Sequence, residues 1–250
     1  MTGRFAGRVA LVTGGGSGVG RATALAFAQE GAAVVVSGRS PNPLAETVRL
    51  IEEQGGVASH VVADVTRSDD VAGLVEAVVA RHDGLDIAFN NAARLALGPI
   101  ADLDESSWSS VMDTNLTGVW LSMKYEIAHM RTHGGGVIVN TASIPTTMVP
   151  GHGAYGASKA GVIALTRAAA REHLSDGIRI NSISPGPVAT SMSLAPGETD
   201  SDRDARIGAQ HPLGRVASPD EIATGVLWLA SPESSYTIGH DLVIDGAATA

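Results

Sequence analysis

The chain has 250 residues, of which 44% are hydrophobic, so it has ample apolar material for a buried core. Its net charge of -9 argues against nucleic acid or an anionic membrane as the main partner, because both need clustered Lys and Arg, and small-molecule partners are favoured. The absence of cysteine excludes a disulfide framework, a thiolate metal site and a cysteine nucleophile, and it is compatible with a cytoplasmic protein.

The first apolar run, at 9–13, ends at glycines and is too short for a signal peptide or a membrane span, so we expect neither. Further short runs rich in β-branched residues recur along the first two thirds of the chain, and each has the length of a strand. The expected strands are 9–13, 33–37, 57–63, 86–90, 137–141 and 178–184.

The segments between these runs are longer and have helical spacing, for example 21–30 before Gly31 and 43–54 before Gly55. Near-continuous apolar strands that alternate with helices indicate a parallel sheet covered on both faces. The predicted fold class is therefore α/β, a doubly wound parallel sheet in a single domain spanning residues 1–250.

Two later segments stand out. Apolar residues at helical spacing from Trp108 to Met130 predict one long helix. Residues 189–211 are rich in Ser, Asp, Gly and Pro, and they predict a long surface loop with at most a short helix. A loop of that length usually has a function, and the alternative is a functionless insert.

The segment TGGGSGVG, at 13–20, follows the first expected strand and opens the first helix, where doubly wound sheets bind phosphate groups. It matches neither G-x-G-x-x-G nor the nucleoside triphosphate pattern G-x-x-x-x-G-K-[ST]. Its glycines at 14, 18 and 20 permit a tight turn and close approach of the backbone to a pyrophosphate. By itself the segment fits an ordinary tight turn equally well.

In YGASK, at 155–159, Lys159 follows Tyr155 by one helical turn, so both side chains leave the same helix face. An ammonium about 4 Å from a phenolate attracts it by about 4 kcal/mol at an effective dielectric constant of about 20. This attraction would bring the phenol pKa from about 10 toward neutrality and make Tyr155 a proton donor and acceptor.

A surface Tyr/Lys pair is the alternative, and the spacing alone favours it. Ser143 argues against it, because this residue is expected at the C-terminal end of a strand, the edge where open α/β sheets bind ligands. A hydroxyl there can donate to a carbonyl oxygen as negative charge develops.

Other polar residues have simpler explanations, and no metal site is predicted. His129 and His133 are one turn apart, but they end a helix, where the helix dipole favours them. Asp102, Asp104 and Glu105 precede the long helix and are typical of its cap and first turn.

Taken together, the motifs resemble the short-chain dehydrogenase/reductase family from end to end. They are TGGGSGVG, Asp64-Val65, NNAA at 90–93, Asn115, Ser143, YGASK, SPGPV at 184–188 and the tail LVIDGA. The resemblance implies a Rossmann-type sheet and an NAD(P)-dependent oxidoreductase that transfers a hydride between the nicotinamide and a secondary alcohol or ketone. Two residues depart from the family pattern, Ala93 in NNAA and Ala247 after Gly246, and Ala93 puts the local backbone in doubt.

The resemblance also implies residue roles. Tyr155 would be the general acid or base, Ser143 would hold the substrate oxygen, Lys159 would bind the nicotinamide ribose and tune Tyr155, and Asn115 would support a water-linked proton relay. The implied cofactor-binding residues are Gly14, Ser17, Gly18, Val19 and Gly20 at the glycine turn, Arg39, Asp64 and Val65 toward the adenosine, Asn90 and Ala92 behind the cofactor, Tyr155 and Lys159, and Pro185, Gly186, Val188 and Thr190 at the nicotinamide.

The cofactor preference depends on the end of the second strand. An acid there would bind the ribose 2'-hydroxyl of NAD, but this chain has Arg39, and its next carboxylate is Glu46. An arginine without an acid can pair with a 2'-phosphate, so NADP(H) is favoured over NAD(H). The alternatives are a solvated Arg39 in an NAD-preferring alcohol dehydrogenase that works in the oxidative direction, or a non-catalytic nucleotide-sensing protein.

The substrate itself is not determined by these residues beyond an alcohol or carbonyl compound. The side chains expected to shape its pocket are Ile144, Thr146, Met148, Val149 and His152.

The helix that begins at Tyr155 predicts a homo-oligomer. Its residues 160–165 and 168–170 are apolar around most of the circumference, whereas a helix that covers a sheet needs only one apolar stripe. Together with the helix at 108–130, this surface predicts a symmetric subunit contact and a homotetramer. The alternative is a monomer whose loop at 189–211 folds over the helix.

Overall fold

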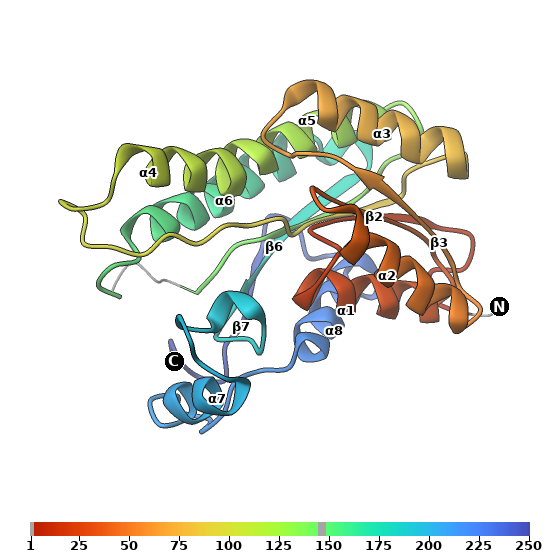
Figure 1. Cartoon of the computed structure of the whole chain (residues 1–250). Helices are drawn as coiled ribbons and strands as arrows, with labels where there is room; N and C mark the ends of the chain where they lie inside the picture. The colour runs from red at the N-terminus through yellow and green to blue at the C-terminus, as the bar shows by residue number, and fades with distance from the viewer. Residues whose placement is uncertain (1–2, 145–148) are drawn as a thin grey trace.

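The computed structural model describes residues 3–144 and 149–250. One seven-stranded sheet forms its centre, in the order β3-β2-β1-β4-β5-β6-β7, and every pair of neighbouring strands is parallel (Figure 1). The strands are β1 Val9–Thr13, β2 Ala33–Gly38, β3 Val57–Val62, β4 Ile87–Asn90, β5 Gly136–Thr141, β6 Ile178–Pro185 and β7 Asp241–Ile244. The predicted doubly wound α/β class is confirmed.

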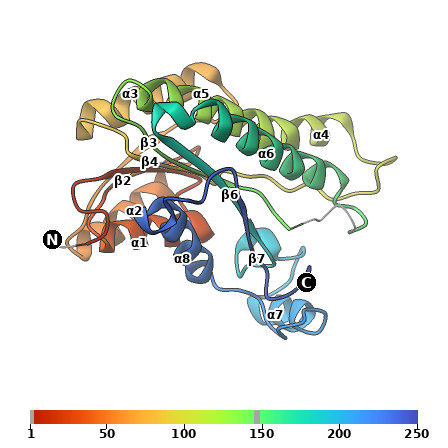
Figure 2. The ribbon, with the colours of Figure 1, turned by 180° about the vertical axis from the view of Figure 1, so that it is seen from behind.

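Helices cover both faces of the sheet (Figures 1 and 2), with α1, α2 and α8 on one face and α3, α4, α5 and α6 on the other. The helices are α1 Gly18–Gln29, α2 Pro41–Glu53, α3 Ser68–His82, α4 Glu105–Met112, α5 Gly118–Met130, α6 Gly153–Glu172, α7 Asp200–Gly208 and α8 Pro219–Ala230. Each layer has its own apolar core, which explains why the strands between them are apolar on both faces.

The register of the sheet decides where the site forms. Thr13 of β1 lies opposite Asn90 of β4, and Asn90 lies opposite Asn140 of β5. Because the strands are parallel, their C-terminal ends meet at one edge, and the motifs that follow β1, β4, β5 and β6 are brought together there.

The predicted single helix at 108–130 is wrong in one respect. The helix begins at Glu105, and a π-helical turn, Asp113–Thr117, separates α4 from α5. The predicted cap is confirmed, because Asp104 Oδ1 accepts a hydrogen bond from the Ser107 amide at 2.8 Å. A π turn places one extra residue in the helix, and here it turns the side chain of Asn115 into the protein interior.

The apolar residues of α6 that face away from the sheet predicted contact with a second subunit, and the structure supports this only in part. The same chain covers part of that helix, since α6 packs against α4 and the π turn. A Cβ atom added to Gly161 would lie 2.8 Å from Leu116 Cδ1, so the two segments approach closely. Ala164 of α6 remains exposed, as do Trp108 and Trp120, which are 45% and 48% exposed.

The loop at 189–211 is built into the fold, which argues against a functionless insert. It contains a 3-10 turn, Ser191–Ser193, and α7. The buried Arg203 donates to Asp200 at 2.7 Å, and Arg206 donates to the Ser193 carbonyl oxygen at 2.9 Å. The first bond lies within α7, and the second ties α7 to the 3-10 turn before it. His211 Nε2 forms a hydrogen bond with the Asp245 carbonyl oxygen at 2.8 Å, which ties the end of the loop to the segment after β7.

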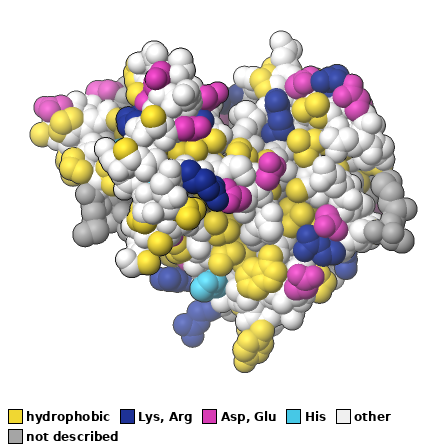
Figure 3. Space-filling model, turned by 90° about the horizontal axis from the view of Figure 1, so that it is seen from below, with side chains coloured by type: hydrophobic (Ala, Val, Ile, Leu, Met, Phe, Trp, Pro, Cys, Tyr) yellow, Lys and Arg dark blue, Asp and Glu magenta, His cyan; other side chains and the backbone are white. Residues whose placement is uncertain are grey.

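Charged side chains of both signs are mixed on one face of the molecule. On the face seen in Figure 3, basic and acidic side chains are interspersed among apolar ones, without a large basic area. No helix in the described part of the chain is long and apolar enough to cross a membrane.

Candidate active site

The glycine turn after β1 has the backbone that phosphate binding needs. Gly14 and Gly18 have φ of +67° and +50°. A Cβ atom on Gly20 would lie 2.2 Å from the Gly14 carbonyl oxygen, so only glycine fits there. Helix α1 begins at Gly18, and the hydroxyl of its cap residue, Ser17, makes no capping bond, which leaves the first amides of the helix available to an anion.

A cavity of about 460 Å³ lies at the carboxyl edge of the sheet, beside this turn. Five segments of the chain line it, which are the glycine turn, the residues after β4, the end of β5 with the residues after it, the start of α6 and the segment after β6. Of the predicted site residues it is lined by Gly14, Ser17, Gly18, Val19, Ala92, Ser143, Tyr155, Lys159, Pro185, Gly186, Val188 and Thr190. These residues fit a dinucleotide whose pyrophosphate lies on α1.

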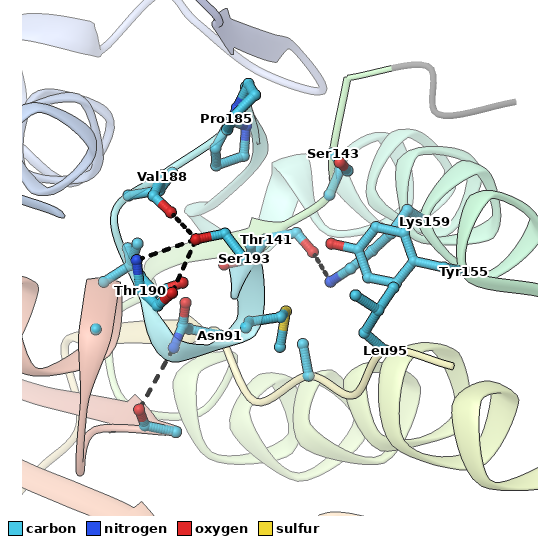
Figure 4. A pocket seen from close by; sticks show the side chains of 18 of the residues that line it. Asn91, Leu95, Thr141, Ser143, Tyr155, Lys159, Pro185, Val188, Thr190 and Ser193 are labelled. Atoms are coloured by element: carbon cyan, nitrogen blue, oxygen red, sulfur yellow. Dashed lines mark hydrogen bonds between the residues drawn. The ribbon is translucent and has the colours of Figure 1, made fainter. Parts of the chain in front are cut away.

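The three proposed reacting side chains meet in this cavity (Figure 4). Ser143 lies two residues beyond β5, and Tyr155 and Lys159 lie in the first two turns of α6. The Lys159 ammonium donates to the Thr141 carbonyl oxygen at 2.7 Å, and its Nζ atom lies 5.8 Å from the centre of the Tyr155 ring. The end of β5 therefore fixes the lysine beside the tyrosine.

In the chain without a bound cofactor, the pKa values of Tyr155 and Lys159 differ from the expectation. Burial raises the pKa of the Tyr155 phenol above its usual value of 10, and only the hydrogen bond with the Ser143 side chain opposes this rise. Burial also lowers the pKa of the Lys159 ammonium to about 7. The expected lowering of the Tyr155 pKa by Lys159 is thus wrong for the chain by itself, because desolvation penalises the phenolate and the ammonium alike.

Asn115 does not line the cavity but supports two of its walls. Its Oδ1 atom accepts from the Arg94 amide at 2.7 Å, and its Nδ2 atom donates to the Arg94 carbonyl oxygen at 2.9 Å and to Ser158 Oγ at 3.1 Å. Ser158 in turn donates to the Tyr155 carbonyl oxygen at 2.7 Å. The buried amide therefore links the segment after β4 to the first turn of α6. A role in a proton relay remains a prediction.

Five other predicted cofactor residues lie outside the cavity lining. Gly20 is the third residue of α1, and Arg39 follows β2 and is exposed. Asp64 follows β3 and accepts from its neighbour Thr66 at 3.0 Å, while Val65 is buried. Asn90 points into the core.

The cavity also contains residues that the sequence reasoning did not assign to the site, which are Asn91, Ala93, Leu95, Thr141, Ala142, Ser191, Met192 and Ser193. The motif NNAA was a signal for Asn91, whose Nδ2 atom donates to the Thr13 carbonyl oxygen at 3.3 Å. No local pattern indicates Leu95 or Met192, because apolar residues in loops are common.

The expected pocket residues Ile144, Val149 and His152 line the cavity. Thr146 and Met148 lie outside the described residues. The doubt about Ala93 does not hold, because its φ is not positive, whereas Ala247 does adopt a positive φ of +70°.

The histidine pair does not line the cavity. The His129 and His133 rings stack with centroids 4.0 Å apart at the end of α5. Within the described ranges no group of three or more His, Asp or Glu side chains could hold a metal.

Comparison with known proteins identifies the family. The model of a family described as Enoyl-(Acyl carrier protein) reductase matches residues 14–249. The chain is 40% identical to a cyclohexanol dehydrogenase from Acinetobacter sp., covering 100% of this chain and 98% of the relative, and 38% identical to a cis-4-hydroxycyclohexanecarboxylate dehydrogenase from Sinomonas cyclohexanicum, covering 98% of each.

Solved structures agree. A short-chain type dehydrogenase/reductase from Mycobacterium marinum has a TM-score of 0.92 and 36% identity, covering 98% of this chain and 96% of that one. Levodione reductase has a TM-score of 0.92 and 33% identity, covering 97% and 98%. The chain therefore belongs to the short-chain dehydrogenase/reductase family, and it is an NAD(P)-dependent oxidoreductase of hydroxyl and carbonyl groups.

Proposed function

We propose that this oxidoreductase interconverts a small alicyclic secondary alcohol and its ketone, with Tyr155 as the proton donor and acceptor. The observation that carries the proposal is the cavity, in which Ser143, Tyr155 and Lys159 face the glycine turn across one space. A bound nicotinamide supplies or accepts the hydride. In the oxidative direction the Tyr155 phenolate takes the proton of the substrate hydroxyl while Ser143 holds the oxygen, and in reduction the Tyr155 phenol donates its proton to that oxygen and becomes the phenolate.

Lys159 has two parts in this proposal. Its ammonium is held at the end of β5 and is placed to bind a hydroxyl of the nicotinamide ribose. Because burial lowers the pKa of this ammonium to about 7, it can also exchange a proton near neutral pH. This exchange would restore the protonation state of Tyr155 after each turnover.

The alicyclic substrate rests on the walls of the cavity around Ser143. Leu95, Ile144, Val149 and Met192 are apolar, and among the described lining residues no Phe or Trp offers a stacking surface. Such a space suits a saturated ring better than a planar aromatic one. The names of two relatives, which act on cyclohexanol and on a hydroxycyclohexanecarboxylate, favour the same class.

NADP(H) is the proposed cofactor, and the surroundings of Arg39 support it. In the described part of the chain, Arg39 forms no ion pair, so its guanidinium is available to a 2'-phosphate. The next carboxylate, Glu46, is already paired with Arg49 at 2.8 Å on α2.

We also propose that the chain assembles as a homotetramer through α5 and α6. The support is the exposed apolar surface that includes Trp120 of α5 and Ala164 of α6.

The test is a panel of substrates with NADP+, NAD+ and their reduced forms, followed by nicotinamide absorbance. The panel contains cyclohexanol, cyclohexanone, both isomers of 4-hydroxycyclohexanecarboxylate, a linear secondary alcohol and a 3-oxoacyl thioester. We expect the highest kcat/KM on the ring compounds. A higher kcat/KM on the linear alcohol or the thioester would refute the alicyclic assignment.

A further inference from the structure

A buried polar cluster lies between the sheet and the helices α5 and α6. These two helices cover the same face of the sheet (Figures 1 and 2). The cluster consists of Glu126 of α5, Asn90 at the end of β4, Asn140 of β5 and Thr166 of α6, and we call it the Glu126 cluster. Glu126 is 1% exposed, and the other three are also buried. No step of the proposed reaction uses these groups.

Hydrogen bonds join the Glu126 cluster across four elements. Asn90 Nδ2 donates to Glu126 Oε2 at 2.9 Å and to Asn140 Oδ1 at 3.0 Å. Asn140 Nδ2 donates to Thr166 Oγ1 at 3.0 Å. The network thus runs from α5 through two strands to α6, the helix that carries Tyr155 and Lys159.

The cluster is also adjacent to the cavity along the backbone. Asn90 directly precedes Asn91 and Ala92, which line the cavity. Asn140 directly precedes Thr141, whose carbonyl oxygen accepts the hydrogen bond from Lys159. A small displacement of either asparagine would therefore move a cavity wall or the partner of the lysine.

We propose that Glu126 is a positioning residue, which acts through Asn90 and Asn140 to hold the ends of β4 and β5 where the cofactor and Lys159 require them. This inference rests on the proposed cofactor site and the proposed role of Lys159. A buried carboxyl is otherwise a costly choice at a core position of α5, whose neighbours Met123, Ile127 and Met130 are apolar.

The protonation of Glu126 controls how well the cluster is satisfied. Within the described residues, Glu126 Oε1 and Asn90 Oδ1 have no hydrogen-bond partner. Both are acceptors while the carboxyl is ionised, and a proton on Glu126 adds a donor to a cluster that has unpaired acceptors. Burial raises the pKa of the Glu126 carboxyl to about 7 against the hydrogen bond from Asn90, and no charged group on the elements packed around it contributes.

The neutral acid therefore maintains the cluster below neutral pH. Above neutral pH, the ionised Glu126 is an unpaired charge in the core, which weakens the cluster and therefore the cofactor site. If only the neutral form binds cofactor, the Kd rises by about tenfold per pH unit above the pKa, and partial coupling gives a smaller rise.

The experiment measures the Kd of NADPH, and of NADH in parallel, by nicotinamide fluorescence from roughly pH 6 to pH 9. Wild type and Glu126→Gln are compared, because glutamine offers an acceptor oxygen and a donor group as the neutral acid does, but cannot ionise. Lys159 titrates in the same range in both proteins, so the readout is the difference between them. We expect equal affinities at the low end and, at the high end, a Kd at least about threefold lower for Glu126→Gln.

Ile127→Ala is the matched control, since Ile127 is the buried neighbour of Glu126 on α5 but lies outside the cluster. This variant should lower Tm and keep the wild-type pH profile of Kd. If Glu126→Gln follows the wild-type profile, or binds more weakly at every pH, the proposal is wrong. If wild type binds neither NADPH nor NADH, the proposed cofactor site is wrong. That result is distinct from identical pH profiles of Kd in wild type and Glu126→Gln, which refute only the role of Glu126.

Discussion

Replacing Lys159 by methionine tests what the buried ammonium costs the fold. Lys159 is 2% exposed, and its hydrogen bond to the Thr141 carbonyl oxygen is the one polar contact of Nζ within the described chain. Burial lowers the pKa of this ammonium from 10.5 to about 7. Since one pKa unit corresponds to about 1.4 kcal/mol, this change bounds the cost to folding at about 5 kcal/mol.

The cost has a definite dependence on pH. Well above the unfolded-state pKa, the lysine is neutral in both the folded and the unfolded chain, and burial costs nothing. As the pH falls toward 7, the unfolded chain binds a proton that the folded chain does not, so the folded state loses stability, and below about 7 the loss is complete. Methionine carries no charge, so Lys159→Met should be more stable than wild type at acidic pH, and this advantage should shrink by about 2 kcal/mol between roughly pH 7 and pH 9.

The assay is equilibrium unfolding in urea without cofactor, at one protein concentration and several pH values. Lys124→Met is the matched control, because Lys124 is the other lysine of the chain and is exposed on α5. It should show no such pH-dependent difference from wild type. The reasoning is refuted if Lys159→Met differs from wild type by the same amount at every pH, or if the difference grows toward alkaline pH.

The same variant should lose both turnover and cofactor affinity, because Lys159 has two proposed roles. A gain in stability with a loss of activity is the result expected when a buried charge is retained for function. A loss of only one kinetic parameter would contradict the double role.

Three further predictions concern the site, the cofactor and the assembly. Tyr155→Phe should abolish turnover and leave the cofactor Kd nearly unchanged, because it removes one oxygen and little volume; substantial residual turnover would contradict the role of Tyr155. Arg39→Ala should weaken NADP binding by about 1.5 to 3 kcal/mol and NAD binding far less, as measured by titration; equal losses would favour NAD as the cofactor. Ala164→Asp should dissociate the assembly in light scattering without disturbing the core, since Ala164 is exposed in the chain; a wild-type mass near 25.4 kDa would refute the tetramer.

The sequence was sufficient for the sheet and for much of the site, because both depend on local patterns and on one rule of topology. The strand predicted at 9–13 is β1 as observed, and the others agree within one or two residues at each end. Once the strands are parallel, their carboxyl ends meet at one edge. The sequence therefore places Ser143 and the glycine turn at one edge of the sheet, and the family resemblance adds Tyr155 to them.

Only the tertiary structure decided the chemistry of the individual groups, because burial and hydrogen-bond partners depend on what packs over each side chain. The four-residue spacing of Tyr155 and Lys159 suggested a lowered phenol pKa, but enclosure by the surrounding segments raises it and lowers the pKa of the lysine. Asn115 is turned inward by a π turn that no apolar periodicity indicates. Glu126 lies one residue before Ile127 on α5 and has no special sequence signal, yet the packing of α5 on β4 and β5 buries it beside Asn90. Sequence patterns record which residues are adjacent along an element, whereas desolvation is set by residues that are distant along the chain and close in the fold.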